Sequence, residues 1–151
     1  MREQLGRSLI EIIGVLAIGA IMISATYSMY HSTNEKQKRL IASETLKDIA
    51  QKTHILLNNS GYKNVSVDYL IEAGVINNDR APAGGNGWSV TSNYEGDEFS
   101  INLVDLSFEE CAYFTAKKFN WVESLVVNGY EATDSSYCMK TGGNIVSFFV
   151  K

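Results

Sequence analysis

The sequence predicts an α+β fold in which one long N-terminal helix packs on a small antiparallel β-sheet. Three observations lead to this prediction. Residues 12–34 contain no Asp, Glu, Lys or Arg, residues 8–57 contain no proline, and short apolar runs typical of strands follow residue 87. A long stretch without proline allows one continuous helix, and short strands joined by turns form antiparallel sheets.

The first half of the long helix is predicted to be transmembrane. Residues 12–30 would form a helix roughly 28 Å long at about 1.5 Å per residue, which matches the apolar core of a bilayer. Arg2 and Arg7 precede this segment, and the next basic residue is Lys36. The positive-inside bias therefore predicts a cytoplasmic N-terminus, with residues beyond 31 on the outer side.

Two features refine this prediction. Tyr27 and Tyr30 lie three residues apart, so they would anchor one helical face at the outer headgroups. A cleaved secretory signal peptide is the alternative, but no small-residue cleavage site follows the apolar run, and the helical pattern continues beyond Tyr30.

Membrane insertion of this segment is predicted to be only marginally favourable. Its large aliphatic residues would contribute about −2 to −4 kcal/mol in total. Two glycines and three hydroxyl residues oppose that term, namely Gly14, Gly19, Ser24, Thr26 and Ser28. A segment held this weakly could leave the bilayer for a bundle of like helices, and the glycines would let such helices approach closely.

Glu11, the carboxylate at the edge of the apolar run, has two explanations. Ser8 and Glu11 have the Ser-x-x-Glu spacing of a capping box, which would satisfy backbone N–H groups at a helix start. Alternatively, a carboxylate beside lipid is retained because a positively charged partner compensates it. The residues themselves favour neither explanation.

The second half of the helix, residues 31–57, is predicted to be amphipathic. An apolar stripe at helical spacing would pack on the sheet, formed by Ala42, Leu46, Ile49, Thr53, Leu56 and Leu57. Turn residues 58–61 would end the helix.

The remaining elements follow in order along the chain. We expect a short helix at 67–76, a loop at 81–87, a hairpin of strands 88–92 and 99–103, a helix at 107–118 that starts with Ser107 and Glu110 as a capping box, and strands at 125–127 and 145–150.

Composition excludes several classes of function. Without Arg2, Arg7, Glu3 and Glu11, the 13 basic and 17 acidic residues of the chain become 11 and 15, so residues 31–151 are acidic. Nucleic acid is therefore not an expected partner, because phosphate binding needs a basic face. No catalytic residues, cofactor site or metal site are predicted, since both histidines lie on the long helix and no cofactor fingerprint occurs.

Cys111 and Cys138 are the two cysteines, and both lie on the predicted outer side of the membrane. A disulfide can persist there, and closing this loop would stabilise the domain by roughly 3.6 kcal/mol in the chain-entropy model. A metal site is the alternative, but His31 and His54 lie far away on the long helix.

The N-terminal residues resemble the class III signal of type IV pilins and pseudopilins. The resemblance rests on the polar leader that ends in Gly6, on the Ser8-Leu9-Ile10-Glu11 run and on the apolar helix after it. It implies that a prepilin peptidase cuts between Gly6 and Arg7, that the new amine of Arg7 is methylated, and that Glu11, the fifth mature residue, meets a neighbouring subunit's N-terminal amine. Arg7 departs from the family pattern, which usually has an apolar residue there, and the proline common near Ser28 is missing.

The outer domain looks most like that of the type IVb pilins. The similarity lies in a small helix, a Gly-rich turn before Trp88, Leu106-Ser107 followed by Cys111, a late Cys138, and a closing strand from Asn144. It implies a pilin-like fold divided into a leader (1–6), a transmembrane and polymerisation helix (7–30), an amphipathic continuation (31–57) and a globular head (58–151).

The function implied by this resemblance is a structural subunit of a type IV pilus, not an enzyme. The expected partners are further copies of the chain in a helical fibre, the prepilin peptidase, the assembly machinery of the bacterial inner membrane, and the bilayer before assembly. The precursor would lie in the inner membrane and the product in an extracellular pilus, where cell adhesion is a family role. A pseudopilin of a type II secretion apparatus and an unprocessed, membrane-anchored binding module are the alternatives.

Overall fold

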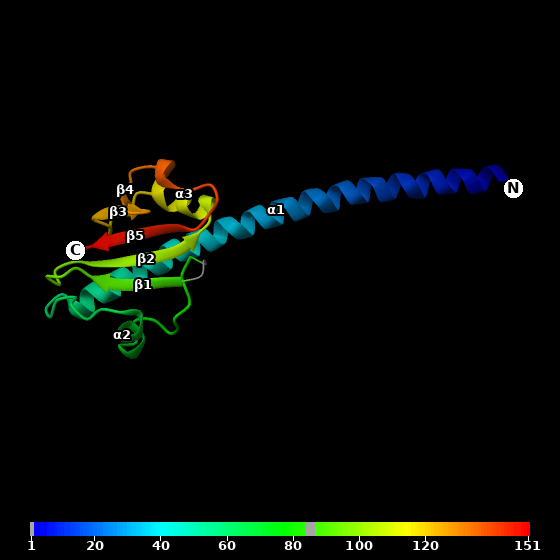
Figure 1. The fold of residues 1–151 in the computed structure, drawn as a ribbon. Coiled ribbons are helices and arrows are strands. Elements are labelled where there is room, and N and C mark those ends of the chain that lie inside the picture. The colour runs from blue at the N-terminus through cyan, green and yellow to red at the C-terminus, as the bar shows by residue number, and fades with distance from the viewer. Residues whose placement is uncertain (1, 84–86) are drawn as a thin grey trace. The chain divides into compact units, whose positions relative to one another are not determined.

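The computed structural model describes residues 2–83 and 87–151, except for the side chains of residues 2–8. Its elements are α1 (Arg2–Leu57), α2 (Val67–Glu72), β1 (Gly87–Ser92), β2 (Phe99–Leu106), α3 (Phe108–Ala116), β3 (Ser124–Val127), β4 (Tyr130–Glu131), the 3-10 turn η1 (Ser135–Tyr137) and β5 (Asn144–Val150) (Figure 1). Two compact units divide the chain, residues 1–38 and residues 39–151, and α1 contributes to both. We call the second unit the head.

The head contains one five-stranded antiparallel sheet with the order β1-β2-β5-β3-β4. The predicted α+β class is therefore confirmed, with a long N-terminal helix and a small antiparallel sheet. The predicted hairpin is β1 and β2, and the two later strands are β3 and β5. Figure 1 shows the sheet in front of the α1 residues that belong to the head, so one face of the sheet is turned toward this helix.

Residues 39–57 of α1 supply part of the head core. The buried side chains of this segment follow the predicted stripe and include Ala42, Leu46, Ile49, Ala50, Thr53 and Leu57. They lie opposite the buried side chains of β2 and β5, among them Phe99, Ile101, Leu103, Val146 and Phe148. The prediction was wrong for Leu56, which is 43 % exposed, because Leu57 takes the inward position in the last turn of the helix.

Two side-chain contacts attach α3 to the α1 residues of the head. The guanidinium of Arg39 donates to the Glu109 carboxylate at 2.6 Å, and the Lys117 ammonium donates to the Ser43 hydroxyl, also at 2.6 Å. The Lys117 ammonium additionally lies over the Tyr113 and Phe119 rings. The capping box predicted at the start of this helix is confirmed, with reciprocal contacts between Ser107 and Glu110.

Backbone irregularities explain where the predicted boundaries differ. The helix predicted over 67–76 ends at Glu72, because Gly74 adopts φ +72°, a conformation that closes helices. A bulge in β2 places Asp105 at φ 59° between Leu103 and Leu106. Both leucines are therefore buried although they lie three residues apart. The two-residue strand β4 was not predicted.

Cys111 in α3 and Cys138 after η1 form the expected disulfide. Both sulfurs are buried in the head core, so this covalent bond ties the loop between β4 and β5 to α3. Within the described residues there is no free cysteine.

A buried asparagine pair holds the same loop from its other side. Asn144 is fully buried, and its amide accepts from the Met139 N–H at 2.6 Å while donating to the carbonyls of Leu106 and Met139. It also accepts from the Asn128 amide, which in turn donates to the Tyr137 carbonyl. Asn128 has φ 52° and with Gly129 forms the two-residue turn between β3 and β4, so one turn residue and one strand residue position the disulfide loop.

Asn144→Ala should destabilise the head by about 2 to 4 kcal/mol, because it leaves buried donors and acceptors without partners. Chemical unfolding of the full chain in detergent would measure this change. Asn120→Ala, at an exposed position, is the control and should stay within about 0.5 kcal/mol of the wild type. If Asn144→Ala is equally silent, the asparagine pair does not hold the loop.

Candidate functional site

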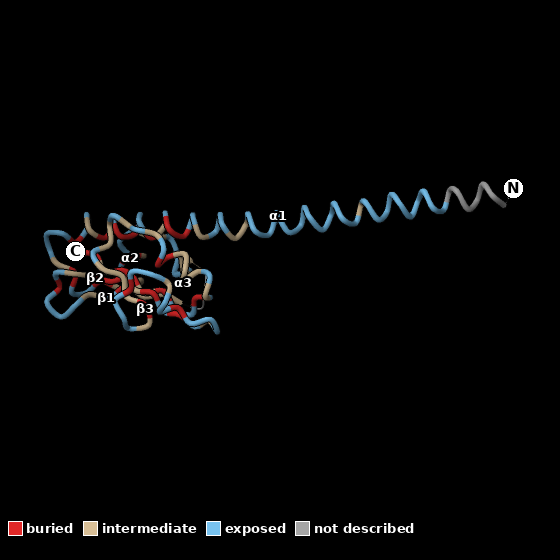
Figure 2. The backbone as a smooth tube through the Cα atoms, turned by 90° about the horizontal axis from the view of Figure 1, so that it is seen from above, coloured by how far each residue is buried: buried red, intermediate tan, exposed pale blue. Residues whose placement is uncertain are grey.

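Apolar side chains cover the surface of α1 from Leu9 to Tyr30. Figure 2 shows this stretch as almost uniformly exposed. The large apolar residues among them are between 57 % and 73 % exposed and comprise Leu9, Ile10, Ile12, Ile13, Val15, Leu16, Ile18, Ile21, Met22, Ile23, Tyr27, Met29 and Tyr30. Soluble proteins rarely expose a contiguous apolar patch of this size. By length and composition this helix could cross a membrane.

Two of the polar side chains in this segment are satisfied within the helix. The Ser24 hydroxyl donates to the Ile21 carbonyl at 2.9 Å, and the Thr26 hydroxyl donates to the Met22 carbonyl at 2.8 Å. An internally bonded hydroxyl costs less to bury than a free one. These two residues therefore oppose insertion less than composition alone indicates.

Gly14 and Gly19 are not explained by packing within the chain. A Cβ atom built at either position would meet no described atom within 4 Å, and neither residue has a positive φ. Each glycine also weakens an exposed helix by about 1 kcal/mol relative to alanine. Packing within the described chain therefore gives no reason for glycine at either position.

Glu11 is an exposed carboxylate at the start of this apolar surface. Among the side chains that the structure describes, it has no ion-pair partner. The helix begins at Arg2, so Ser8 lies inside it and does not occupy the N-cap position of this chain. The capping explanation therefore does not apply to the uncleaved chain, but a helix that starts at Arg7, as expected after cleavage, would again have Ser8 in its first turn. Both explanations of Glu11 stay predictions.

The predicted site residues fall into two separate groups. Gly6 and Arg7 belong to the α1 backbone, but the Arg7 side chain lies outside the described residues, as does that of Ser8. Cys111 and Cys138 are brought together in the head. Sequence reasoning missed the Asn128–Asn144 pair, although the Asn128-Gly129 dipeptide is a strong signal of a hairpin turn.

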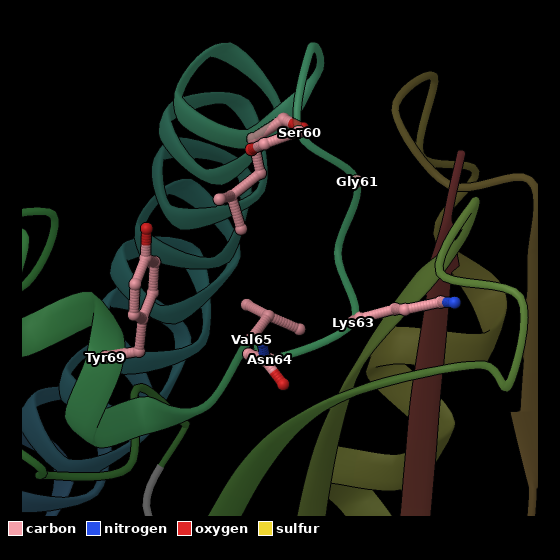
Figure 3. A pocket seen from close by; sticks show the side chains of 7 residues that line it. Ser60, Gly61, Lys63, Asn64, Val65 and Tyr69 are labelled. Carbon is pink, nitrogen blue, oxygen red and sulfur yellow. The ribbon is translucent and has the colours of Figure 1, made fainter.

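The pockets of the head differ in the charged residues that line them, and one beside α1 is lined by Asp48, Lys52 and Arg80 among others. One pocket of about 220 Å³ is lined by Leu57, Ser60, Gly61, Lys63, Asn64, Val65 and Tyr69. Figure 3 shows its single charged side chain, Lys63, pointing away from Ser60 and Tyr69. Within residues 2–83 and 87–151 there is no cluster of three potential metal ligands.

The titratable groups with shifted pKa values are dispersed. Burial raises the pKa of Tyr62, whose hydroxyl lies 2.7 Å from Nδ1 of His54. Hydrogen bonding by Asn93 lowers the pKa of Asp97, and hydrogen bonding by Ser136 lowers that of Asp134. Both aspartates lie in exposed turns, so these shifts have local structural causes.

Comparison with known proteins adds no relative, since neither the protein-family models nor the curated proteins gave a match to this chain. The apolar surface of residues 9–30, with Glu11 at its start, is therefore the candidate functional site on physical grounds. Such a surface is suited to insertion into a bilayer and to association with other apolar helices.

Replacing Gly14 and Gly19 together with leucine should make membrane insertion more favourable by about 1 kcal/mol or more, because each leucine adds about 0.3 to 0.6 kcal/mol and each glycine weakened the helix. A glycosylation-based insertion assay of residues 1–38 fused to a reporter would measure this. An unchanged inserted fraction would show that the segment already inserts completely and is not marginal.

Proposed function

We propose that the chain is a structural subunit of a type IV pilus, of the type IVb class. The precursor is processed after Gly6 and polymerises through residues 7–30 into an extracellular fibre. One observation carries this proposal: an exposed apolar helix surface with a single carboxylate, Glu11, for which the described chain has no charged partner. A disulfide-closed α+β head, as expected of an exported pilin-like domain, supports it.

The Glu11 carboxylate suits a role in assembly better than a role in anchoring. A carboxylate in a lipid-facing helix costs up to about 2.5 to 3.5 kcal/mol near the bilayer centre, so a permanent anchor gains nothing from it. In a bundle of like helices, a cation from the next subunit would compensate this charge in a medium of low dielectric constant. Cleavage after Gly6 would create such a cation, the amine of Arg7, four residues before Glu11.

The marginally favourable membrane insertion predicted for this segment fits the same function. A subunit that moves from the inner membrane into a fibre must exchange lipid contacts for helix contacts at low cost. The small residues at positions 14 and 19 allow close helix approach, which is how helices associate where water provides no driving force. The proposed route therefore has two apolar environments, with the bilayer first and the fibre core second.

Glu11→Gln tests the proposal directly. Glutamine keeps the shape but removes the charge, so a neighbouring amine in the fibre core would lose its partner at a cost of roughly 3 to 5 kcal/mol. We expect normal membrane insertion, because a neutral side chain inserts at least as well, together with lost or sharply reduced fibre yield. Quantifying the subunit in sheared surface fibres and in membranes measures both properties.

Glu95→Gln is the matched control, because it makes the same chemical change in an exposed turn of the head. It should leave both membrane and fibre levels unchanged. Wild-type fibre yield from Glu11→Gln cells would refute the pairing role of Glu11.

A further inference from the structure

The face of the sheet turned away from α1 carries two continuous rows of side chains. Directly paired residues of antiparallel strands share one face. The strand register therefore places Thr91, Ser100, Phe149 and Ser124 in one row, and Ser89, Asn102, Ser147 and Val126 in the next. We call these eight residues the outer sheet face.

The outer sheet face is neutral and rich in hydroxyl groups. Five of its residues are Ser or Thr, one is Asn, and none is charged, although Asp, Glu, Lys and Arg make up 20 % of the chain. The nearest charged residues lie at its margins, namely Glu131 next to Val126 on the short edge strand β4, and Glu98 and Lys151, two residues from Ser100 and Phe149 at the strand ends. The eight residues of the face themselves therefore offer no counterion to a charged ligand.

Its polar groups form a partly connected layer. The Thr91 and Ser100 hydroxyls lie 3.0 Å apart, and the Asn102 amide donates to Thr91 at 3.1 Å and to Ser89 at 3.3 Å. Ser124 and Ser147 have no side-chain partner among the described residues. A hydroxyl is one donor and two acceptors, so this layer retains free capacity for hydrogen bonds.

Phe149 supplies an apolar centre. It is half-buried and lies between Ser100 and Ser124 on the neighbouring strands, with Ser147 two residues away on the same face. An aromatic ring surrounded by short hydroxyl side chains offers one flat apolar surface and several hydrogen-bonding groups. This combination matches a sugar ring, which presents C–H groups on its face and hydroxyls at its edge.

The size of the face disfavours a second copy of the chain as its principal partner. Four strands at about 4.8 Å spacing and about 20 Å of strand length give roughly 300 Å². A stable protein interface needs about 800 Å² per partner. An extended ligand of small cross-section fits the available area better.

We propose that the outer sheet face binds a neutral polysaccharide, with Phe149 stacking on a sugar ring and Ser147, Ser124 and Asn102 hydrogen-bonding its hydroxyls. The binding itself does not depend on the proposed fibre. The overall affinity for a polysaccharide does depend on the proposed fibre. A single flat site binds weakly, and many copies along a fibre would raise the overall affinity by avidity.

The test uses the full chain, solubilised as a monomer in a detergent without a sugar headgroup, and a column of immobilised cellohexaose as the neutral probe. We expect retention that free cellohexaose reverses. Ser147→Glu should lower this retention at least tenfold, because it removes a hydrogen-bonding hydroxyl and puts a longer side chain beside the Phe149 ring, and Phe149→Ala should lower it by removing the ring.

The matched controls lie off the face. Asn120→Glu adds the same charge in an exposed turn, and Tyr94→Ala removes a side chain that is 98 % exposed in the β1–β2 connection. Both should be retained like the wild type, and thermal unfolding of every variant should show an intact head.

Two results would overturn the proposal. The first is no retention of the wild-type chain above a blank column, which would mark the face as an ordinary solvated surface. The second is unchanged retention of a folded Ser147→Glu variant. Because the chain is monomeric in this test, failure of fibre assembly cannot produce either result.

Discussion

An uncovered apolar surface on the first part of α1 is the constraint on which the rest of the structure depends. Within the described chain nothing buries the large side chains of residues 9–30, so they require lipid or other apolar helices. The head must then be stable without them. Its core begins at Ala42 and draws on α1, the sheet and α3, and the disulfide and the asparagine pair fix the last long loop.

The segment that forms this surface combines features suited to two environments. Hydroxyls bonded to backbone carbonyls make Ser24 and Thr26 compatible with lipid. A carboxylate at Glu11 and glycines that no intrachain packing requires are poorly suited to a simple anchor. The same residues are useful where helices of several subunits pack closely and a positive charge is available. This combination of features in one helix fits the proposed subunit, which leaves the bilayer for a fibre.

Sequence reasoning succeeded where one physical signal dominates. The absence of charge and proline predicted the long helix, and the spacing of Ser107 and Glu110 predicted the capping box of α3. Two cysteines in a domain that was expected to be exported predicted the disulfide. Sequence reasoning failed where tertiary contacts decide the structure. The bulge at Asp105 lets two leucines three residues apart share the core, and the two residues of β4 are too short for a periodic signal. Asn144 resembles any turn residue until the fold buries it.

The central claim is that this chain is a processed fibre subunit, and the mature N-terminus of the protein tests it most directly. Mass spectrometry of the subunit from sheared surface fibres and from membranes would identify that terminus. Cleavage between Gly6 and Arg7 predicts an N-terminal peptide that starts at Arg7 in the fibre fraction, with the longer precursor confined to the membrane. A chain that keeps Met1 wherever it is found, and that is missing from surface fibres, would contradict the account and indicate a permanently anchored protein.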